Sequence, residues 1–458
     1  LLFLMRILIA GAGIVGNNLA EQLSEEGHDI SIIDGNAEKI RRISNTLDVM
    51  SVCGNACMPS VLVKAGIRDM EMVIAVTNKD EINLMVCFLA SKFQVSKRFA
   101  RLRDMEFTGS GQIFSPEELF IDQAINPGEI IIDTILKILQ TPGAVNVAEF
   151  AQGKVLLREF DLPENAPLTG KSIKELVSIS DLDLIIIVAI VREGKLIIPQ
   201  PEDILQTGDR IYTLVNKEFL PFLLPMLNKT IDAVEKIVIY SANPVSINLA
   251  KALEETVKDV CIIEPSRETA NKAAEELSKT LVHHGTGTDL DLFNEINMKD
   301  VDFFMALSDD DENNILASLL AKKYGARRAL VITNDPEYLP ILDSIGIDIT
   351  VNPRLIVIST ILKHLRKGGV ISVFKLIEDA EVMELVVDAK STIAGNRISN
   401  LDFPEDAMIG AILRQGEMLA PDEKSTVQEG DSVIVVALSS AIEKIEKLFG
   451  RKRHFFPF

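Results

Sequence analysis

The sequence has few cysteines, and nothing in their spacing suits metal or redox chemistry. It contains four, and none belongs to a CxxC motif or to a Cys/His pattern typical of a metal site. Cys53 and Cys57 are close in sequence, but Gly54 and Asn55 between them predict a turn, so we interpret both as small apolar residues. This cysteine usage fits a reducing cytosol.

Long apolar runs are also missing. None reaches the roughly eighteen residues needed to cross a bilayer, so we expect no direct membrane insertion. The four residues before Met5 have no basic segment and no cleavage site, which argues against a signal peptide and makes Met5 the expected start.

Positive charge is in deficit. The chain has 47 Lys and Arg against 67 Asp and Glu, a net charge of −20. Such a chain is disfavoured as a binder of nucleic-acid phosphates or of an anionic membrane surface, so proteins or small ligands are the expected partners. A length of 458 residues predicts three or four domains, and 47% hydrophobic residues suffice for several cores.

The clearest motif lies at the start of the chain. Residues 6–10 predict a buried strand, Gly11, Gly13 and Gly16 form GxGxxG, residues 17–26 predict a helix, and residues 30–33 predict a second strand that ends on Asp34. In this pattern the first glycine allows the tight turn, the second admits a pyrophosphate, and the third lets helix and strand pack closely. The helix N-terminus offers free N–H groups to the phosphates.

Asp34 supplies the other half of the fingerprint. A carboxylate at this distance can accept hydrogen bonds from an adenosine ribose and would repel a 2′-phosphate, which favours NAD over NADP. The same contact would serve NAD⁺, NADH, ATP or ADP, so it does not distinguish among them.

Alternating strands and helices continue the α/β pattern. Strands are predicted at 49–52, 72–76 and 98–102 and a helix at 80–93, which implies a parallel sheet with right-handed crossovers. An amphipathic helix follows at 126–140. Beyond it, short strands around Leu162 and at 185–191, 196–198 and 210–215 predict a small α+β unit.

The pattern then repeats from Glu235 onward. KIVIYSANPVSINLAKALEE corresponds to MRILIAGAGIVGNNLAEQLSEE, Glu264 to Asp34, and VREGKLIIP to LRQGEMLAP, so the chain is two tandem copies of one two-domain module. The second copy has Ser241, Asn243 and Ser246 in place of the three glycines. Side chains at these places should block a pyrophosphate, so we interpret the second copy as degenerate.

Three further residues are candidates for the ligand site. Thr77 and Asn78 follow the fourth strand, and Arg101 ends the fifth, at the sheet edge where parallel α/β folds bind ligands. Thr77 and Asn78 can equally cap the next helix. Arg101, with Arg103, can clamp phosphate oxygens or form a surface salt bridge to Asp104 or Glu106.

Other polar groups do not suggest catalysis. Acidic residues at helix starts, Asp80 and 309–311, are interpreted as capping groups rather than a cation site. No Ser/His/Asp or Cys/His set can be placed at the strand ends, and no placed His, Lys or Tyr suggests a dehydrogenase. We therefore expect a protein that is not an enzyme.

Taken together, these motifs resemble the TrkA family, the peripheral NAD-binding subunits of Trk potassium uptake systems, built from tandem RCK (KTN) domains. The resemblance rests on AGAGIVG with Asp34, the GNA turn, AVTNKDEIN, ARLRD and NPGEIIIDTILKIL, each echoed in the second copy. It implies an α/β fold of tandem Rossmann-like subdomains with parallel sheets, each followed by a small α+β subdomain. The implied domains are 5–124 and 234–350 for the Rossmann-like subdomains and 144–228 and 370–450 for the small ones.

The resemblance also implies a site and an assembly. The family's nucleotide contacts fall on Gly11, Ala12, Gly13, Ile14, Val15, Asp34, Thr77, Asn78 and Arg101. NAD⁺ or NADH would act as an effector, with ATP or ADP as further ligands. Four chains would form a homotetrameric gating ring of eight Rossmann-like subdomains, cytoplasmic and attached to the inner face of the cell membrane through a potassium-translocating subunit of the Trk or Ktr type.

The helix at 126–140 is part of this implied assembly. In the family it crosses over between neighbouring subdomains, which would make Ile130, Ile131, Ile135 and Ile138 a partner-facing surface. The small subdomains are where we expect dimer contacts or a second effector, and their hairpin turns suggest no ligand. Three alternatives stay open: an NAD-dependent oxidoreductase, a structural scaffold that binds no nucleotide, and a soluble regulator of a potassium efflux or channel protein, which the sequence does not separate from uptake.

Overall fold

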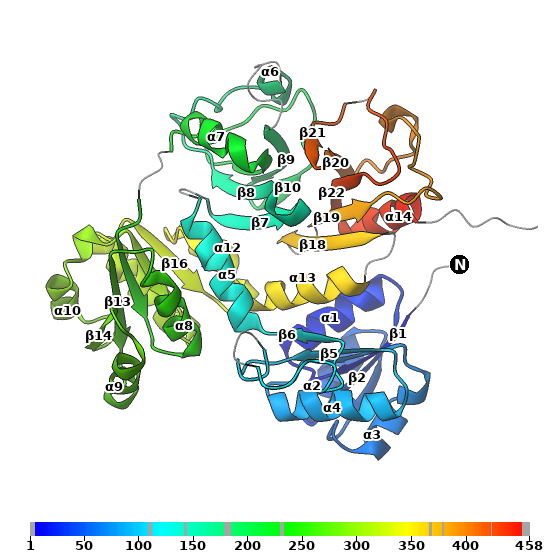
Figure 1. The fold of residues 1–458 in the computed structure, drawn as a ribbon, viewed down its shortest axis with the longest axis horizontal. Coiled ribbons are helices and arrows are strands. Elements are labelled where there is room, and N and C mark those ends of the chain that lie inside the picture. The colour runs from blue at the N-terminus through cyan, green and yellow to red at the C-terminus, as the bar shows by residue number, and fades with distance from the viewer. Residues whose placement is uncertain are drawn as a thin grey trace, which may run out of the picture. The chain divides into compact units, whose positions relative to one another are not determined.

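The computed structural model describes residues 5–108, 112–141, 144–177, 185–229, 233–365, 369–377, 380–422 and 424–450. The residues before Met5 lie outside this set. The chain divides into two compact units, Leu1–Ile130 with Pro353–Ile361, and Ile131–Asn352 with Leu362–Phe458 (Figure 1).

The first unit contains a six-stranded parallel sheet with the order β3-β2-β1-β4-β5-β6. Its central strands are apolar and buried along almost their whole length, as a sheet covered on both faces requires. The strands are β1 Arg6–Ala10, β2 Asp29–Asp34, β3 Met50–Cys53, β4 Met72–Ala75, β5 Lys97–Arg101 and β6 Gln123–Ile125; the helices between them are α1 Ile14–Glu25, α2 Ala37–Thr46, α3 Pro59–Lys64 and α4 Asp80–Lys92.

Helices α3 and α4 cover one face of this sheet. Leu62 from α3 and Val86 from α4 share a core with Leu8 and Val73 from the strands. Helix α1 begins three residues earlier than the predicted 17–26, because Gly13 has extended angles (φ −72°, ψ −176°) and acts as its N-cap. The helix therefore starts inside the glycine motif.

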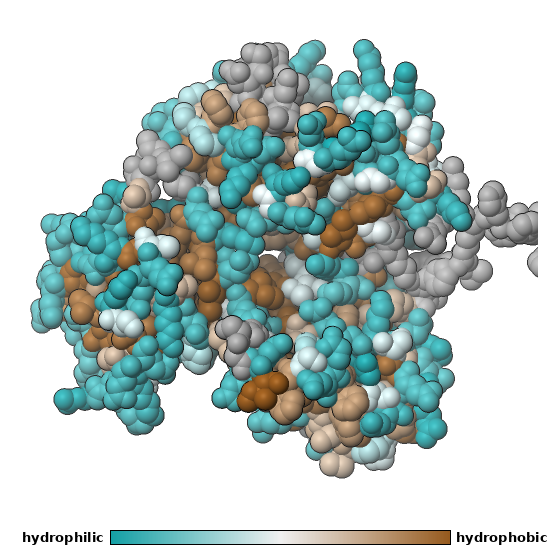
Figure 2. Space-filling model, in the orientation of Figure 1, coloured by the Kyte–Doolittle hydropathy of each residue, from teal (hydrophilic) through white to brown (hydrophobic). Residues whose placement is uncertain are grey.

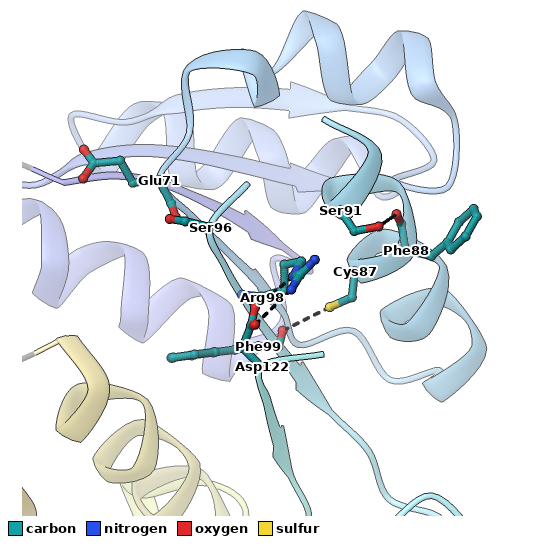
Figure 3. Close-up of polar contacts among 8 residues, drawn as sticks. All are labelled: Glu71, Cys87, Phe88, Ser91, Ser96, Arg98, Phe99 and Asp122. Carbon is teal, nitrogen blue, oxygen red and sulfur yellow. Dashed lines mark hydrogen bonds and ion pairs between the residues drawn. The ribbon is translucent and has the colours of Figure 1, made fainter. Parts of the chain in front are cut away.

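Strand β6 is a feature that sequence patterns missed. Asp122, just before it, accepts hydrogen bonds from the Arg98 backbone N–H and Nε, both at 2.8 Å, and from Nη2 at 2.9 Å (Figure 3). This contact ties the start of β6 to β5. A strand of three residues is too short to show a period, so the helix expected after the fifth strand in fact follows a sixth.

The second unit contains the equivalent parallel sheet, with the order β14-β13-β12-β15-β16-β17. Its strand order and register repeat those of the first sheet, as the internal repeat predicts. The strands are β12 Lys236–Tyr240, β13 Asp259–Glu264, β14 Leu281–His284, β15 Phe303–Ala306, β16 Arg328–Ile332 and β17 Ile349–Val351; the helices are α8 Pro244–Leu253, α9 Arg267–Glu276, α10 Leu290–Glu295, α11 Asp311–Lys323, α12 Leu339–Ser344 and α13 Pro353–Leu365, whose residues up to Ile361 belong to the first unit.

Two small antiparallel sheets complete the second unit, with the orders β10-β9-β11-β8-β7 and β18-β19-β22-β20-β21. Sequence patterns missed β7 and placed a strand around Leu162, which lies just after β8. The first sheet has β7 Asn146–Phe150, β8 Val155–Asp161, β9 Ile185–Arg192, β10 Lys195–Ile197 and β11 Arg210–Asn216, with α6 Ile173–Val177 and α7 Leu220–Met226; the second has β18 Val370–Ile377, β19 Ala380–Val386, β20 Ala407–Arg414, β21 Glu417–Leu419 and β22 Ser432–Leu438, with α14 Ser439–Phe449.

The predicted hairpins are confirmed. Strands β9 and β10 pair through Arg192 and Lys195, and β20 and β21 pair through Arg414 and Glu417. The fold class expected from the sequence, tandem Rossmann-like subdomains each followed by a small α+β subdomain, is therefore confirmed. The four domain boundaries stay a prediction.

The two small sheets share one core within the second unit. Leu157, Val188 and Leu214 from the first pack with Val382 and Ala411 from the second. Elsewhere, hydrophobic residues reach the surface along β18 and β19 on the face drawn in Figure 2.

The first crossover helix, α5 (Pro127–Leu139), buries the apolar face that the sequence predicts. Ile131, Ile135 and Ile138 are almost fully buried within this single chain, and Ile130 is half-buried. The chain thus covers much of the surface that was expected to face a partner.

Candidate functional site

The glycine turn connects β1 to α1 at the carboxyl edge of the first sheet, where it contacts the ends of β2 and β4. Gly11 has φ +111°, which favours glycine, and its N–H donates to the Ile33 carbonyl at 2.8 Å. A Cβ on Gly11 would lie 2.9 Å from the Thr77 backbone nitrogen. The turn is therefore pressed against the end of β4 and could not be built from bulkier residues without moving it.

The other two glycines have different surroundings. A Cβ on Gly16 would lie 1.8 Å from the Gly11 carbonyl oxygen, so close helix packing requires glycine there. A Cβ on Gly13 would meet nothing within 4 Å, so this residue borders open space. Of the neighbouring predicted contacts, Ala12 and Val15 are buried and Ile14 is exposed.

Asp34 has a structural role that the sequence did not suggest. Its Oδ2 accepts the Ala12 N–H at 2.8 Å and its Oδ1 accepts the Asn36 N–H at 2.7 Å, so the acid ties the glycine turn to the end of β2. A carboxylate has about four acceptor sites, which leaves capacity for ribose hydroxyls. The predicted residues Gly11–Val15 and Asp34 are therefore brought together.

Thr77 is held by a buried asparagine. Its N–H and its hydroxyl both donate to Asn83 Oδ1, at 2.9 and 2.7 Å, and Asn83 Nδ2 donates to the carbonyls of Thr77 and Arg101. Asn83 thus clamps the ends of β4 and β5 together. The capping alternative also holds in part, because the Thr77 hydroxyl accepts the Lys79 N–H at 3.3 Å. Asn78 is exposed.

Asn83 was visible in the sequence as part of a repeated motif, and its role was missed. In the second copy Asn314 makes the same contacts, with Ser308 and the Ile332 carbonyl. Its recurrence at one offset in both repeats was the signal that could have identified it.

Arg101 points to the same edge of the sheet. Its Nη2 donates to the Thr77 carbonyl at 2.8 Å, and Asp104, one of the two acids of the salt-bridge alternative, accepts the Glu106 N–H. Burial is the main cause that lowers the pKa of Arg101 to about 10, with the charge of Arg103 next. A buried guanidinium whose positive charge is only partly balanced by nearby acids is suited to bind an anionic ligand.

The second repeat keeps the scaffold of this site. Ser241 has φ +83°, the left-handed conformation of Gly11, and its N–H donates to the Ile263 carbonyl at 2.8 Å. Glu264 accepts the Ala242 N–H at 2.7 Å and the Ser266 N–H at 2.8 Å, as Asp34 does in the first repeat. The turn and its acid therefore serve the fold in both copies.

The second repeat fills the space that the first leaves open. Asn243, at the place of Gly13, donates from Nδ2 to the Leu307 carbonyl at 2.6 Å and accepts the Ser246 N–H. Tyr240, at the place of Ala10, is buried, and a Cβ on Gly287 would lie 2.9 Å from its ring. The Asn243 side chain therefore stands where Gly13 leaves open space in the first repeat, and Tyr240 lies in the core beside Gly287.

The acidic residues at helix starts make local contacts. Asp310 caps α11 by accepting the Asn313 N–H at 2.9 Å, and Asp311 accepts the Thr333 hydroxyl and the Asn334 N–H. In the first repeat Asp80 accepts the backbone N–H groups of Arg103 and Asp104. Across the part of the chain that the structure describes, no group of three His, Cys, Asp or Glu side chains could hold a metal, and no helix could span a membrane.

Comparison with known protein families matches nearly all of these elements. The TrkA-N domain model matches residues 7–127 and 237–353, and the TrkA-C domain model matches 157–218 and 382–450. The chain is 32% identical to the Trk system potassium uptake protein TrkA of Halomonas elongata, over 99% of this chain and all of that protein. It is 33% identical to TrkA of Haemophilus influenzae, over 97% of this chain and 98% of that one.

Solved structures show the same fold. The GsuK RCK domain superposes with a TM-score of 0.61 at 17% identity, over 97% of this chain and 95% of that one. A GsuK channel bound to NAD superposes with a TM-score of 0.60 at 16% identity, over 97% of this chain and 79% of that one.

Proposed function

Because the chain belongs to the TrkA family, whose TrkA-N and TrkA-C domains it carries twice, we propose that it is a regulatory subunit that controls a membrane potassium-translocating subunit in response to a nucleotide. The proposal extends to this chain the potassium uptake that its relatives' names state. The observation that carries the nucleotide part is the open glycine turn of the first repeat, with Asp34 beside it.

The nucleotide lies over the first repeat in this proposal. Gly11 to Val15 receive the phosphates at the start of α1, Asp34 accepts the adenosine ribose, and Thr77, Asn78 and Arg101 border the ligand from β4 and β5. NAD⁺ or NADH is the proposed effector, and ATP or ADP can use the same ribose and phosphate contacts. The GsuK channel that binds NAD has the same fold, which supports this choice.

The second repeat does not take a dinucleotide in this way. Asn243 stands at the place of the open Gly13 and hydrogen-bonds across the turn to the Leu307 carbonyl, so one site per chain is proposed. No bond need be made or broken, because a ligand that binds one conformation better than another shifts the equilibrium by its differential affinity, typically about 1–3 kcal/mol per site.

Assembly follows the family's pattern in this proposal. Four chains form a cytoplasmic ring of eight Rossmann-like subdomains at the inner face of the membrane, held there by the potassium-translocating subunit. Light scattering should then give a mass four times the 50.4 kDa of one chain.

The decisive experiment is calorimetric titration of the full chain with NAD⁺, NADH, ATP and ADP. We expect one site per chain and no change in nicotinamide absorbance beyond binding. The matched variants are Asp34→Ala and Glu264→Ala, since each removes an acid that accepts two backbone N–H groups of its own repeat.

The two variants separate ligand binding from fold. Asp34→Ala should abolish nucleotide binding, and Glu264→Ala should preserve it. Two equal sites would overturn the one-site proposal, steady consumption of the nicotinamide would favour an oxidoreductase, and no binding at all would favour a scaffold.

A further inference from the structure

We propose that Arg354, on the second repeat's helix α13, completes the phosphate site of the first repeat, so that bound nucleotide fastens this helix to the first Rossmann-like sheet. The inference rests on the proposed function, and it adds a residue and a regulatory contact that neither the glycine motif nor the first repeat contains. Its basis is the environment of Arg101.

Arg101 has an unused donor at the ligand edge. The Nη2 of its guanidinium donates to the Thr77 carbonyl. Thr77 in turn packs against the glycine turn at Gly11. Its Nε is buried and has no hydrogen-bond partner among the described residues. A buried charged donor without a hydrogen bond is destabilising, so an anion at this place would be strongly favoured.

A second guanidinium lies within electrostatic range of the first. Residues Pro353–Ile361 of α13 belong to the compact unit built around the first sheet, and Arg354 is half-buried. The charges of Arg103 and Arg354 both lower the pKa of Arg101, and among its charged neighbours only Asp80 raises it. Asp80 in turn accepts the backbone N–H groups of Arg103 and Asp104. The charge of Arg101 is therefore only partly balanced by its neighbours.

The two repeats differ at these places in a coordinated way. The second sheet has Ile332 where the first has Arg101, and the first crossover helix has Gly128 where α13 has Arg354. The sheet with three motif glycines and Arg101 thus shares its unit with the helix that carries an arginine. A repeat used only for assembly would have no reason to place both charges on one unit.

A phosphate group would change the energy of this contact. Without it, the Nε of Arg101 stays buried with no hydrogen-bond partner among the described residues. With it, both guanidinium groups bind the same oxygens by charge-assisted hydrogen bonds, which holds the first part of α13 to the sheet. Nucleotide occupancy in the first repeat is then transmitted to a helix of the second repeat.

The test uses the full chain and three variants. Arg354→Gln removes the charge, Arg354→Lys keeps it, and Lys363→Gln removes an exposed charge from the last turn of the same helix. ADP and NAD⁺ are titrated by calorimetry, thermal unfolding is followed without ligand, and hydrogen exchange of residues 353–361 is compared with and without ADP.

Arg354→Gln should weaken ADP and NAD⁺ by about tenfold or more, the loss of a charge-assisted hydrogen bond. Arg354→Lys should restore part of the affinity, and Lys363→Gln should bind like the natural chain. ADP should slow exchange of residues 353–361 in the natural chain and not in Arg354→Gln. Without ligand, Arg354→Gln should unfold at the same temperature as the natural chain, because in this proposal Arg354 acts through the bound phosphate.

Other outcomes overturn the inference in distinguishable ways. Unchanged affinity in Arg354→Gln would remove Arg354 from the site while leaving the proposed function intact. A lower unfolding temperature without ligand, together with weaker binding, would show that Arg354 only supports the fold. If the natural chain bound neither ADP nor NAD⁺, the proposed function itself would fail.

Discussion

Asp34 and Glu264 show how much of a binding motif is also structural. Each carboxylate accepts one backbone N–H from the turn after the first strand of its repeat and one from the residue two positions after the acid itself. This holds in both repeats, although only the first keeps the glycines. The acid therefore stabilises the turn whether or not a nucleotide binds. Residue-level tests must separate these two roles.

Gly13 and Gly16 allow that separation. Gly16→Ala would place a methyl group 1.8 Å from the Gly11 oxygen, so we expect roughly 2 kcal/mol or more of destabilisation together with loss of nucleotide binding. Gly13→Ala meets open space and keeps an extended φ. Alanine is a poorer N-cap than glycine, which lowers stability, but it also reduces the entropy of the unfolded chain, which raises stability. Each effect is under about 1 kcal/mol, so the free energy of unfolding should hardly change.

Nucleotide affinity should nevertheless fall about tenfold in Gly13→Ala, because the new methyl group lies where the pyrophosphate approaches. Denaturant unfolding and calorimetry on both variants make the check. Full affinity in Gly13→Ala would mean that the ligand does not cross this turn.

Cys87 provides a prediction on pH. Its thiol lies in the core of the first sheet and donates to the Phe99 carbonyl (Figure 3), and burial raises its pKa from 9.0 to about 12. The folded chain thus holds this proton where the unfolded chain loses it. The contribution of Cys87 to stability is complete below about pH 9 and is lost as the pH rises toward 12.

Thiol alkylation at about pH 8 tests the same property, since only the thiolate reacts. Cys53 is exposed and should be labelled first, whereas Cys87 should react only as the chain opens. Mass spectrometry of each cysteine peptide follows the rates, and a denatured sample in which all four react alike is the control. Equal native rates at Cys53 and Cys87 would contradict the buried placement.

At the scale of elements, the two small sheets pack closely against each other around Gly410. Gly410 in β20 is the second-copy equivalent of Val188 in β9, and a Cβ on Gly410 would lie 2.8 Å from Val188 Cγ1 and 2.6 Å from Leu214 Cδ1. A large residue in one sheet thus faces the smallest one in the other. The two copies have diverged to fit each other within one chain.

Gly410→Val should overpack this joint and destabilise the second unit by about 1–3 kcal/mol. The exchange variant Val188→Gly with Gly410→Val restores the total volume, so it should recover part of that loss. Denaturant unfolding of the two single variants and the double variant gives the coupling energy. Additive effects would mean that these residues do not share a contact.

At the scale of the whole molecule, the ligand acts on one of two compact units. A chain of this size should unfold in more than one step. A nucleotide at about 100 times its Kd stabilises the state that binds it by about 2.7 kcal/mol. Only the unfolding temperature of the first unit, Leu1–Ile130 with Pro353–Ile361, should therefore rise.

Scanning calorimetry with and without NAD⁺ measures the shift, and hydrogen exchange assigns each transition to its unit. Gly13→Ala is the control that should lose the shift. An equal shift of both transitions would show that the second repeat also binds the ligand.

Much of the fold followed from local patterns. The apolar strands, the glycine turn, the repeat and the hairpins at 193–194 and 415–416 were predicted and are present, because buried strands, helix faces and turns each leave a short-range signature. The short strands β6 and β7 were missed, since three to five residues carry no reliable period. Within the candidate site, Asn83 was missed because its side-chain hydrogen bonds join two separate segments, at Thr77 and Arg101.

The sequence by itself determined the class of fold, the duplication and which copy keeps an open glycine turn, all of which depend on residue types at fixed local spacing. Only the tertiary structure decided which groups meet: that Asp34 ties down the turn, that Asn243 closes its counterpart, and that the start of the helix carrying Arg354 belongs to the same compact unit as Arg101. These contacts arise when distant segments are brought together by burial of the apolar faces, and that process leaves no mark in the spacing of neighbouring residues.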